Sequence, residues 1–316
     1  MFQFIADQIT YHLLNLPTEN ALGDALNFFI YDTFKILTLI FIVISVVAFI
    51  RTFLALSQLK NLLTKSHYGL GNLIAALFGA ITPFCSCSSI PLFTGFIKGN
   101  IPMGIAFSFL ITSPLVNEVA FILMGGLFGW RLAFLYAITG IILGVVAGLF
   151  IGSLKMEDQL ILDNKEEKLK AKTVPLKLEN KINFAVKEGW KTLKKLTPYV
   201  IIGVAMGAII HGYVPQDFFI KSIGEYQILA VPIAVLLGIP IYAGCSTVAP
   251  LIFGITSSGI PLGTSLAFMM AIAGLSLPEA IILKRVMSLK LLAVFFLVVA
   301  IGITMIGYFF NFMAAK

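Results

Sequence analysis

The chain has 316 residues, of which 59% are hydrophobic and only 12% are charged. Because soluble globular domains carry about 25% charged residues, this composition excludes an ordinary soluble domain and predicts an all-α polytopic membrane protein. The net charge of +7 does not indicate nucleic-acid binding, since eleven of the 22 lysines and arginines fall between Lys155 and Lys195, where they are mixed with acidic residues.

Residues 1–154 are predicted to form the first transmembrane half. The segment 1–19 mixes polar and apolar residues, and we expect it to lie as a helix at the membrane interface rather than to act as a secretory signal. Four further elements are predicted here: a span near 26–56, a broken element over 69–99, an interrupted span over 101–126 and a span over 132–154.

A charged linker over 155–190 is predicted to join this half to a second one over 191–316. The stretch 226–278 contains no Asp, Glu, Lys or Arg, and as a straight helix it would be roughly 80 Å long, so it must fold back inside the membrane. The second half is divided in the same way as the first, into predicted elements over 194–214, 227–259, 260–283 and 291–312.

The two halves repeat each other at an offset of 159 residues. Prolines and glycines coincide at this offset in the pairs Pro91 and Pro250, Gly95 and Gly254, Pro102 and Pro261, and Gly104 and Gly263. An insertion of two residues would then align Glu118 with Glu279. Paired segments interrupted by Pro and Gly predict two inverted repeats, with the substrate site at their interface.

The distribution of lysine and arginine predicts the membrane sides. If each broken element is a re-entrant hairpin, the linker, Lys98, Lys284 and Arg285 share one side, which the positive-inside rule assigns to the cytoplasm of an inner-membrane protein. Spanning elements would divide the positive charge between both sides. The count favours the hairpin, and two tilted half-helices that meet in mid-membrane remain an alternative.

The breaks within the repeats carry the predicted chemistry. Pro83 lacks an amide donor and should end one helix, and the serines after it are good helix caps. We expect hinges or breaks at five prolines: Pro83, Pro91, Pro114, Pro240 and Pro250. All three cysteines of the chain lie in the two breaks, where helix ends would favour the thiolate. Each cysteine could instead be a small buried residue, but their confinement to paired breaks favours a function.

The predicted substrate-binding residues are small, polar or thiol side chains at the breaks: Cys85, Ser86, Cys87, Ser88, Ser113, Asn117, Glu118, Cys245 and Ser246. Cys-x-Cys is not a zinc-site spacing and has no histidine pair beside it, so we expect no metal site and no cofactor. Thiolates suit a soft ligand such as a trivalent metalloid.

Two carboxylates are candidates for coupling transport to an ion or a proton. Glu118 and Glu279 each follow a proline inside an apolar span, where a carboxylate is costly and usually functional. Ser113-Pro114 is expected to unwind the helix before Glu118. For Glu279 the alternative is a position near the cytoplasmic surface, beside Lys284 and Arg285.

The segment Thr82-Pro83-Phe84-Cys85-Ser86-Cys87-Ser88, followed by Ser113-Pro114 and Asn117-Glu118, resembles the ArsP-type predicted permease family, which includes YraQ-like proteins. Gly244-Cys245-Ser246 is similar to the second-half element of that family. Because some members export trivalent organoarsenicals, the resemblance implies that Cys85 and Cys87 lie where such a substrate is handled.

We therefore predict a transporter rather than an enzyme. It should be secondary-active, because no phosphate-binding Gly-x-x-x-x-Gly-Lys-Ser/Thr motif is present and ATP is therefore not expected to drive transport directly. The expected substrate is a small thiophilic solute such as an organoarsenical, and a small sulfur-containing anion held at helix N-termini is the alternative. A membrane thiol oxidoreductase is a third, weaker reading. The expected partners are the substrate and the lipid bilayer, with no nucleic acid, and a homo-oligomer remains open.

Overall fold

The computed structural model describes residues 2–13, 21–51, 69–82, 86–161, 178–213, 229–241, 252, 256 and 259–314. Within these ranges the chain forms α1 (Phe2–Asp7), the π-helix η1 (Gln8–Leu13), α2 (Ala21–Arg51), α4 (Leu70–Ile81), α5 (Ser86–Lys98), α6 (Met103–Leu115), α7 (Glu118–Phe128), α8 (Trp130–Ser153), the 3-10 helix η2 (Glu157–Gln159), α9 (Leu178–Tyr213), α11 (Ala230–Gly238), α13 (Leu262–Gly274), α14 (Leu277–Leu283) and α15 (Leu289–Ala314). In this part of the chain the only β-type pairing is an isolated bridge between Leu160 and Met287, so the predicted all-α class is confirmed.

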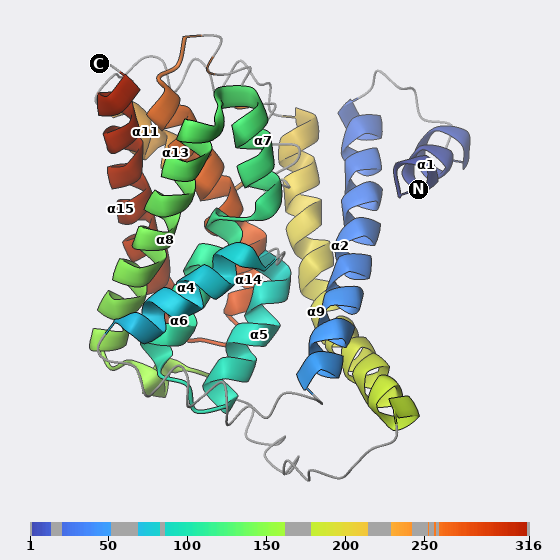
Figure 1. The fold of residues 1–316 in the computed structure, drawn as a ribbon. Coiled ribbons are helices and arrows are strands. Elements are labelled where there is room, and N and C mark those ends of the chain that lie inside the picture. The colour runs from blue at the N-terminus through green and yellow to red at the C-terminus, as the bar shows by residue number, and fades with distance from the viewer. Residues whose placement is uncertain are drawn as a thin grey trace.

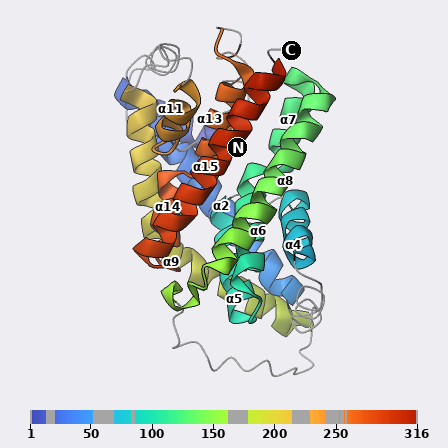
Figure 2. The same cartoon turned by 90° about the vertical axis from the view of Figure 1, so that its left-hand side faces the viewer.

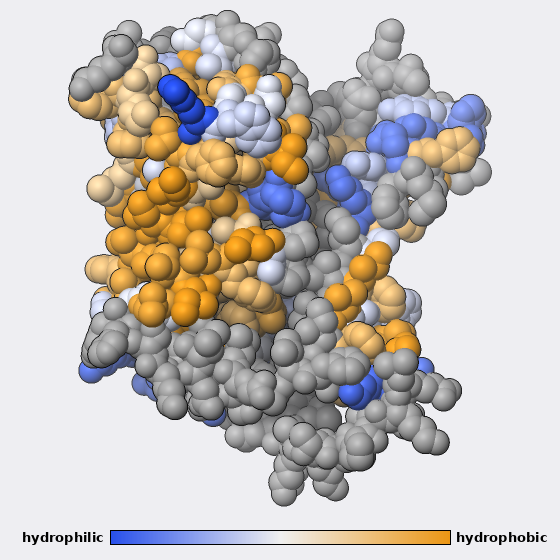
Figure 3. Space-filling model, in the orientation of Figure 1, coloured by the Kyte–Doolittle hydropathy of each residue, from blue (hydrophilic) through white to orange (hydrophobic). Residues whose placement is uncertain are grey.

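Several of these helices are long and apolar enough to cross a membrane. Among the described residues, three segments qualify by length and composition: Trp130–Ser153, Leu262–Leu283 and Leu289–Ala314. The bent pair of α6 and α7, with 45° between its arms, would be a fourth. Figure 3 shows an apolar surface over the bundle that contains α8 and α15. The chain is therefore a membrane protein, as its composition predicts.

The helices are arranged in two parts. In Figures 1 and 2, α2 and α9 form an antiparallel pair beside a bundle built from α4 to α8 and α11 to α15. The α2–α9 contact is close at Gly189, where an added Cβ would meet Phe41 and Ser45. The ring of Phe41 also packs edge-on against Trp190, with 6.1 Å between centroids. The pair thus joins the two halves of the chain at one side.

The amino-terminal helix packs against α2 on the side away from the bundle (Figure 1). Asn27 donates to Asp7 over 2.8 Å, and Gln3 donates to both Asp7 and the Asn27 carbonyl. This polar contact attaches α1 to α2, and the interfacial position expected for 1–19 is not tested by it.

The charged segment between the halves is partly helical. Helix α9 begins at Leu178, inside the range 155–190 that we expected to be a linker. Near its other end, Ile161 donates to the carbonyl of Val286 and Ser288 donates to that of Gln159, each over 2.8 Å. The start of the linker therefore lies beside the turn between α14 and α15.

Close helix crossings through glycine occur at the same places in both halves. A Cβ on Gly104 of α6 would lie 2.8 Å from the carbonyl oxygen of Gly148 on α8, and a Cβ on Gly263 of α13 would collide with the carbonyl oxygen of Gly307 on α15. Gly104 and Gly263 are 159 residues apart in the chain, and so are Gly148 and Gly307. Small residues let helix backbones approach closely in membrane proteins. The α8 glycines at 140, 144 and 148 likewise lie at close helix contacts.

The short first helices of the two broken elements also pack in the same way. A Cβ on Gly79 of α4 would lie 3.0 Å from the carbonyl oxygen of Phe109, and one on Gly238 of α11 would lie 3.1 Å from that of Phe268. Gly238 and Phe268 again follow Gly79 and Phe109 by 159 residues. Figures 1 and 2 show α4 in the lower half of the bundle and α11 in the upper half, and in Figure 1 α8 descends while α15 ascends.

Candidate functional site

The first broken element interrupts the chain between α4 and α5. Thr82 ends α4 in an extended conformation (φ −89°, ψ 132°), as a residue before proline should, and its hydroxyl donates to the carbonyl of Phe78 over 2.5 Å. Pro83 and Cys85 lie outside the described residues. Ser86, Cys87 and Ser88 form the first turn of α5, and their side chains are likewise not described; Pro91 lies inside α5.

Helices α4 and α5 both pack against α6. Asn72, near the start of α4, donates to the Ser108 hydroxyl of α6 over 2.9 Å, and a Cβ on Gly79 near its end would lie 3.2 Å from the amide nitrogen of Ser113. Ser89, near the start of α5, hydrogen-bonds to the Ser113 hydroxyl over 2.8 Å. From the end of α5 a turn through Asn100, with a positive φ of 56°, leads into α6. The end of α4 and the start of α5 therefore lie beside the same part of α6.

Ser113 is the predicted site residue that the structure brings closest to the first break. Its hydroxyl and that of Ser89 are both fully buried and hydrogen-bonded to each other. Ser89 lies two residues after Cys87 in the same helix. The pair thus fixes the first turn of α5, which carries one of the cysteines, against the central helix α6.

The break between α6 and α7 lies later than predicted. We expected Ser113-Pro114 to unwind the helix, but α6 continues through Pro114 to Leu115 and ends at Val116. Proline removes only its own amide from the helical hydrogen bonds, and the amide of Val116 still donates to Thr112 over 2.8 Å. The new helix begins after Asn117, whose side chain accepts from the amide of Ala120 over 2.7 Å.

A tyrosine that the sequence analysis missed binds the end of α6 at this break. Tyr136 of α8 is 1% exposed, and its hydroxyl donates to the carbonyl of Leu115 over 2.7 Å. Carbonyl groups at a helix end lack partners within the helix, and a buried one is costly if it stays unpaired. A tyrosine inside an apolar span indicates a buried hydrogen-bond donor. Which carbonyl accepts from it depends on how α8 crosses α6, and the sequence does not give this crossing.

Asn117 and Glu118 lie at the outside of this break. Asn117 is partly buried and caps α7, and Glu118, the first residue of α7, is exposed on the surface of the molecule. Figure 3 shows a hydrophilic group interrupting the apolar surface at mid-height, over the lower end of α7. Asn117 thus has a structural role as the cap of α7.

In the second half, the residues that carry the predicted chemistry lie outside the described part. These are Cys245, Ser246 and Pro250. Pro240, two residues after α11, is described and partly buried. The carbonyl of Ile239 accepts from the amide of Leu277 over 2.9 Å, which attaches the end of α11 to the start of α14. The chain toward Cys245 therefore leaves from the α13–α14 break.

Glu279 lies in α14 directly after this second break. Its side chain is 1% exposed, and neither carboxylate oxygen has a hydrogen-bond partner. Lys284 and Arg285, five and six residues later, are exposed, and the position of Glu279 near the cytoplasmic surface stays a prediction. A buried carboxyl without partners is costly, so this residue needs an explanation beyond packing.

The expected alignment of Glu118 with Glu279 is also wrong. Asn117 and Ser276 are the residues before α7 and α14, and they are related by the same 159 residues as the glycine contacts. No insertion is needed, so Glu279 corresponds to the fully buried Ala120. The offset of 159 residues is therefore the same at these two helix starts and at the glycine crossings.

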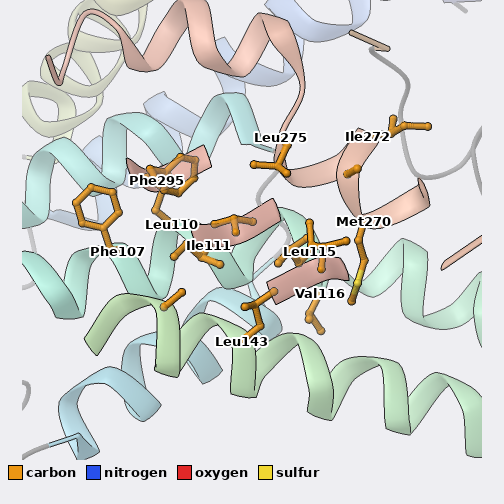
Figure 4. Close-up of a cluster of buried hydrophobic side chains, with 14 of the residues drawn as sticks. Phe107, Leu110, Ile111, Leu115, Val116, Leu143, Met270, Ile272, Leu275 and Phe295 are labelled. Atoms are coloured by element: carbon orange, nitrogen blue, oxygen red, sulfur yellow. The ribbon is translucent and has the colours of Figure 1, made fainter. Parts of the chain in front are cut away.

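The two breaks meet in the centre of the bundle. Figure 4 shows Leu115 and Val116 of the first break close to Met270 and Leu275 of the second. A Cβ on Gly274 would lie 2.9 Å from Leu115. The contact is apolar and fully buried on both sides. It brings together the end of α6 and the end of α13.

Among the described residues, no group of three or more His, Cys, Asp or Glu side chains could hold a metal ion. The described part of the site offers buried hydroxyls, helix ends and one buried carboxyl.

Comparison with known proteins places this architecture among transport proteins. The model of the ArsP_1 family, described as a predicted permease, matches residues 21–312. A UPF0718 protein of Methanocaldococcus jannaschii is 23% identical over 74% of this chain and 80% of its own. A putative two-component membrane permease complex subunit of Streptococcus mutans is 27% identical over 60% of this chain and 62% of its own.

Two further UPF0718 proteins are similar. YcgR of Bacillus subtilis is 24% identical over 72% of this chain and 78% of its own, and YraQ of Escherichia coli is 27% identical over 23% of this chain and 21% of its own. No solved structure matches the chain.

Proposed function

Because the chain belongs to the ArsP_1 family of predicted permeases, we propose that it is a secondary-active permease for a small thiophilic solute, with export of trivalent organoarsenicals as its activity. The family indicates transport rather than catalysis. The proposed route is alternating access around a mid-membrane site formed by the two broken elements.

The recurrence of the same contacts at an offset of 159 residues is the observation that carries this proposal. Gly104 and Gly263 each cross a glycine of the last helix in their half, while α8 and α15 run in opposite directions. Opposite direction with equal contacts is what two inverted repeats require, and such repeats hold transporter sites at their interface. We propose that residues 1–154 and 191–316 are these repeats.

The membrane arrangement follows from the same observations. We propose that the α4–α5 hairpin is re-entrant, since it packs along half of the bundle and returns to the start of α6. The linker over 155–190 would then face the cytoplasm of an inner-membrane protein, together with the basic turn after α14, which lies beside it.

The proposed substrate residues surround the two breaks. Cys85, Cys87 and Cys245 would offer thiolates to a trivalent arsenic centre, with Ser86, Ser88 and Ser246 as neighbouring hydroxyls. The Ser89–Ser113 hydrogen bond supports this arrangement, because it holds the first turn of α5 in the centre of the bundle. The prolines at 83, 91, 114, 240 and 250 would supply the bends.

A second subunit is a further element of the proposal. The Streptococcus mutans relative is named as a subunit of a two-component permease complex. We propose that this chain also assembles in the membrane, either with itself or with another membrane protein.

Uptake of a trivalent methylarsenical into everted membrane vesicles tests the function. We expect energy-dependent uptake by the wild type and its loss in Cys85→Ser, Cys87→Ser and Cys245→Ser. Met305→Ser is the matched control, because it removes a sulfur atom from an exposed position on α15 and should leave uptake unchanged.

The outcome separates the substrates. Absence of uptake by folded wild-type protein would refute the arsenical assignment. Uptake of thiosulfate or sulfite that the arsenical does not inhibit would instead support the small sulfur anion, held by helix N-termini.

A further inference from the structure

Glu279 is a buried carboxyl group for which the fold provides no partner. Both of its oxygens are inaccessible to solvent, and neither has a hydrogen bond. It is the third residue of α14, immediately after the break that faces α11. Native structures rarely leave a buried carboxyl without a hydrogen bond, so the role of Glu279 depends on whether it carries a proton.

Burial without a hydrogen-bond partner favours the neutral acid at Glu279. Helix α14 packs against α9 and α5. The charged side chains that the structure describes on α5, on α9 and after α14 are Lys98, Lys181, Lys187, Lys191, Lys194, Lys284 and Arg285, while the side chains of Glu179 and Glu188 on α9 lie outside the described part. None of these basic side chains is buried, and none hydrogen-bonds to the carboxyl group. A carboxylate without a counter-charge in an apolar environment takes up a proton.

The first half shows that the break itself does not require an acid. At the corresponding position α7 has Ala120, which is fully buried. Asn117 and Ser276 precede the two helices at equivalent positions, so a helix begins at this point with and without the carboxyl. An alanine would avoid the cost of burial, and the carboxyl at 279 therefore serves a purpose that stability does not explain.

The position of Glu279 connects it to the segment that carries Cys245. The amide of Leu277, two residues before it, donates to the carbonyl of Ile239 at the end of α11. The chain continues from there through Pro240 toward Cys245. A movement of α14 that brings water to Glu279 would thus also act on the start of the second broken element.

We propose that Glu279 is the proton-binding group of this transporter. In the arrangement described, the carboxyl oxygen holds the proton; when α14 moves and water enters, the O–H bond breaks and the proton passes to water. The carboxylate then takes a proton from the other side of the membrane. The proposal rests on the transport function above, and it assigns coupling to Glu279 and not to the exposed Glu118.

A hydrophobic carbodiimide tests the protonation state without any transport measurement. The protonated carboxyl adds across the N=C=N group to give an O-acylisourea, which rearranges to a stable N-acylurea with no leaving group. We expect mass spectrometry of the full-length protein in membranes to find the adduct on Glu279, and Glu279→Gln to abolish it. Glu118→Gln is the matched control and should leave the adduct on Glu279 unchanged.

Transport of the trivalent methylarsenical tests the coupling. We expect Glu279→Gln to lose accumulation driven by a proton gradient at least tenfold, while exchange of labelled for unlabelled solute stays within about twofold of wild type, because glutamine imitates the protonated acid. Glu279→Asp should retain accumulation with a shifted pH profile. Glu157→Gln, at an exposed acid in η2 outside the proposed site, should retain both activities.

The results distinguish this inference from the proposed function. Gradient-driven accumulation by Glu279→Gln at the wild-type level would overturn the inference and leave the permease intact. An unlabelled Glu279 in folded wild-type protein would also overturn it. Failure of the wild type both to accumulate and to exchange the arsenical would count against the proposed function, and the carbodiimide result would still decide whether Glu279 is a buried acid.

Discussion

The α6–α7 and α13–α14 breaks lie at equivalent positions and differ in their side chains. At the first break Asn117 caps α7 and Glu118 is exposed. At the second Ser276 precedes α14 and Glu279 is buried without a partner. The helices thus begin at equivalent positions in the two halves, but the polar groups differ, and so does the bend: α6 and α7 meet at 45°, whereas α13 and α14 together qualify as one span. This asymmetry suits a transporter whose two halves bind different species.

The packing around the breaks differs in the same way. Tyr136 on α8 binds the end of α6, and the corresponding residue on α15 is Phe295. The first half links α4 to α6 through Asn72, and the second half links α15 to α13 through Asn311, which accepts from the amide of Gly263 over 2.7 Å. Polar residues joining membrane helices occur in both halves, but at non-equivalent positions.

The largest expected effect tests whether the two glycine crossings are equivalent. We expect Gly104→Val and Gly263→Val each to lower the free energy of unfolding by about 3 kcal/mol, because the added atoms meet a neighbouring backbone. Unfolding in mixed detergent micelles measures this. Gly126→Val is the control, since nothing lies within 4 Å of its added Cβ. If only one of the two variants lowered the free energy of unfolding, the two crossings would not be equivalent.

The next effect concerns the buried carboxyl. We expect Glu279→Met to raise the free energy of unfolding by about 2 kcal/mol, because an unpartnered polar group is replaced by an apolar one of similar length. Glu118→Met, at an exposed position, should change it little. Destabilisation by Glu279→Met in the same micelles would mean that the carboxyl stabilises the fold after all.

Tyr136→Phe places the second-half residue in the first half. We expect a loss of about 1.5 kcal/mol in the free energy of unfolding, since the buried carbonyl of Leu115 loses its donor. Tyr308→Phe, at an exposed position on α15, is the matched control. An equal effect of both variants would show that the hydroxyl of Tyr136 does not stabilise the break.

The smallest effect is expected for the polar link between α4 and α6. Asn72→Val should cost about 1 kcal/mol, because the buried Ser108 hydroxyl loses one partner. The double variant Asn72→Val, Ser108→Ala reproduces Val231 and Ala267 of the second half and should recover most of the loss. A double-mutant cycle gives the coupling, and additive losses would contradict the assigned hydrogen bond.

The sequence alone determined the class of the protein and most of its helices. The spans predicted over 132–154 and 291–312 correspond to α8 and α15 within about two residues. Gly104 and Gly263, which coincide at the offset of 159 in the sequence, make equivalent helix crossings in the structure. These features depend on local hydrophobicity and on prolines and glycines, which act on the backbone wherever they stand.

Only the tertiary structure decided where the breaks fall and which acid is buried. The break after Val116 depends on the capping of α7 by Asn117 and on Tyr136 from another helix, and the burial of Glu279 depends on α9 and α5. Neither is visible in a single segment, because both arise from contacts between residues distant in the chain. The gathering of the three cysteines stays a prediction, since it depends on such contacts too.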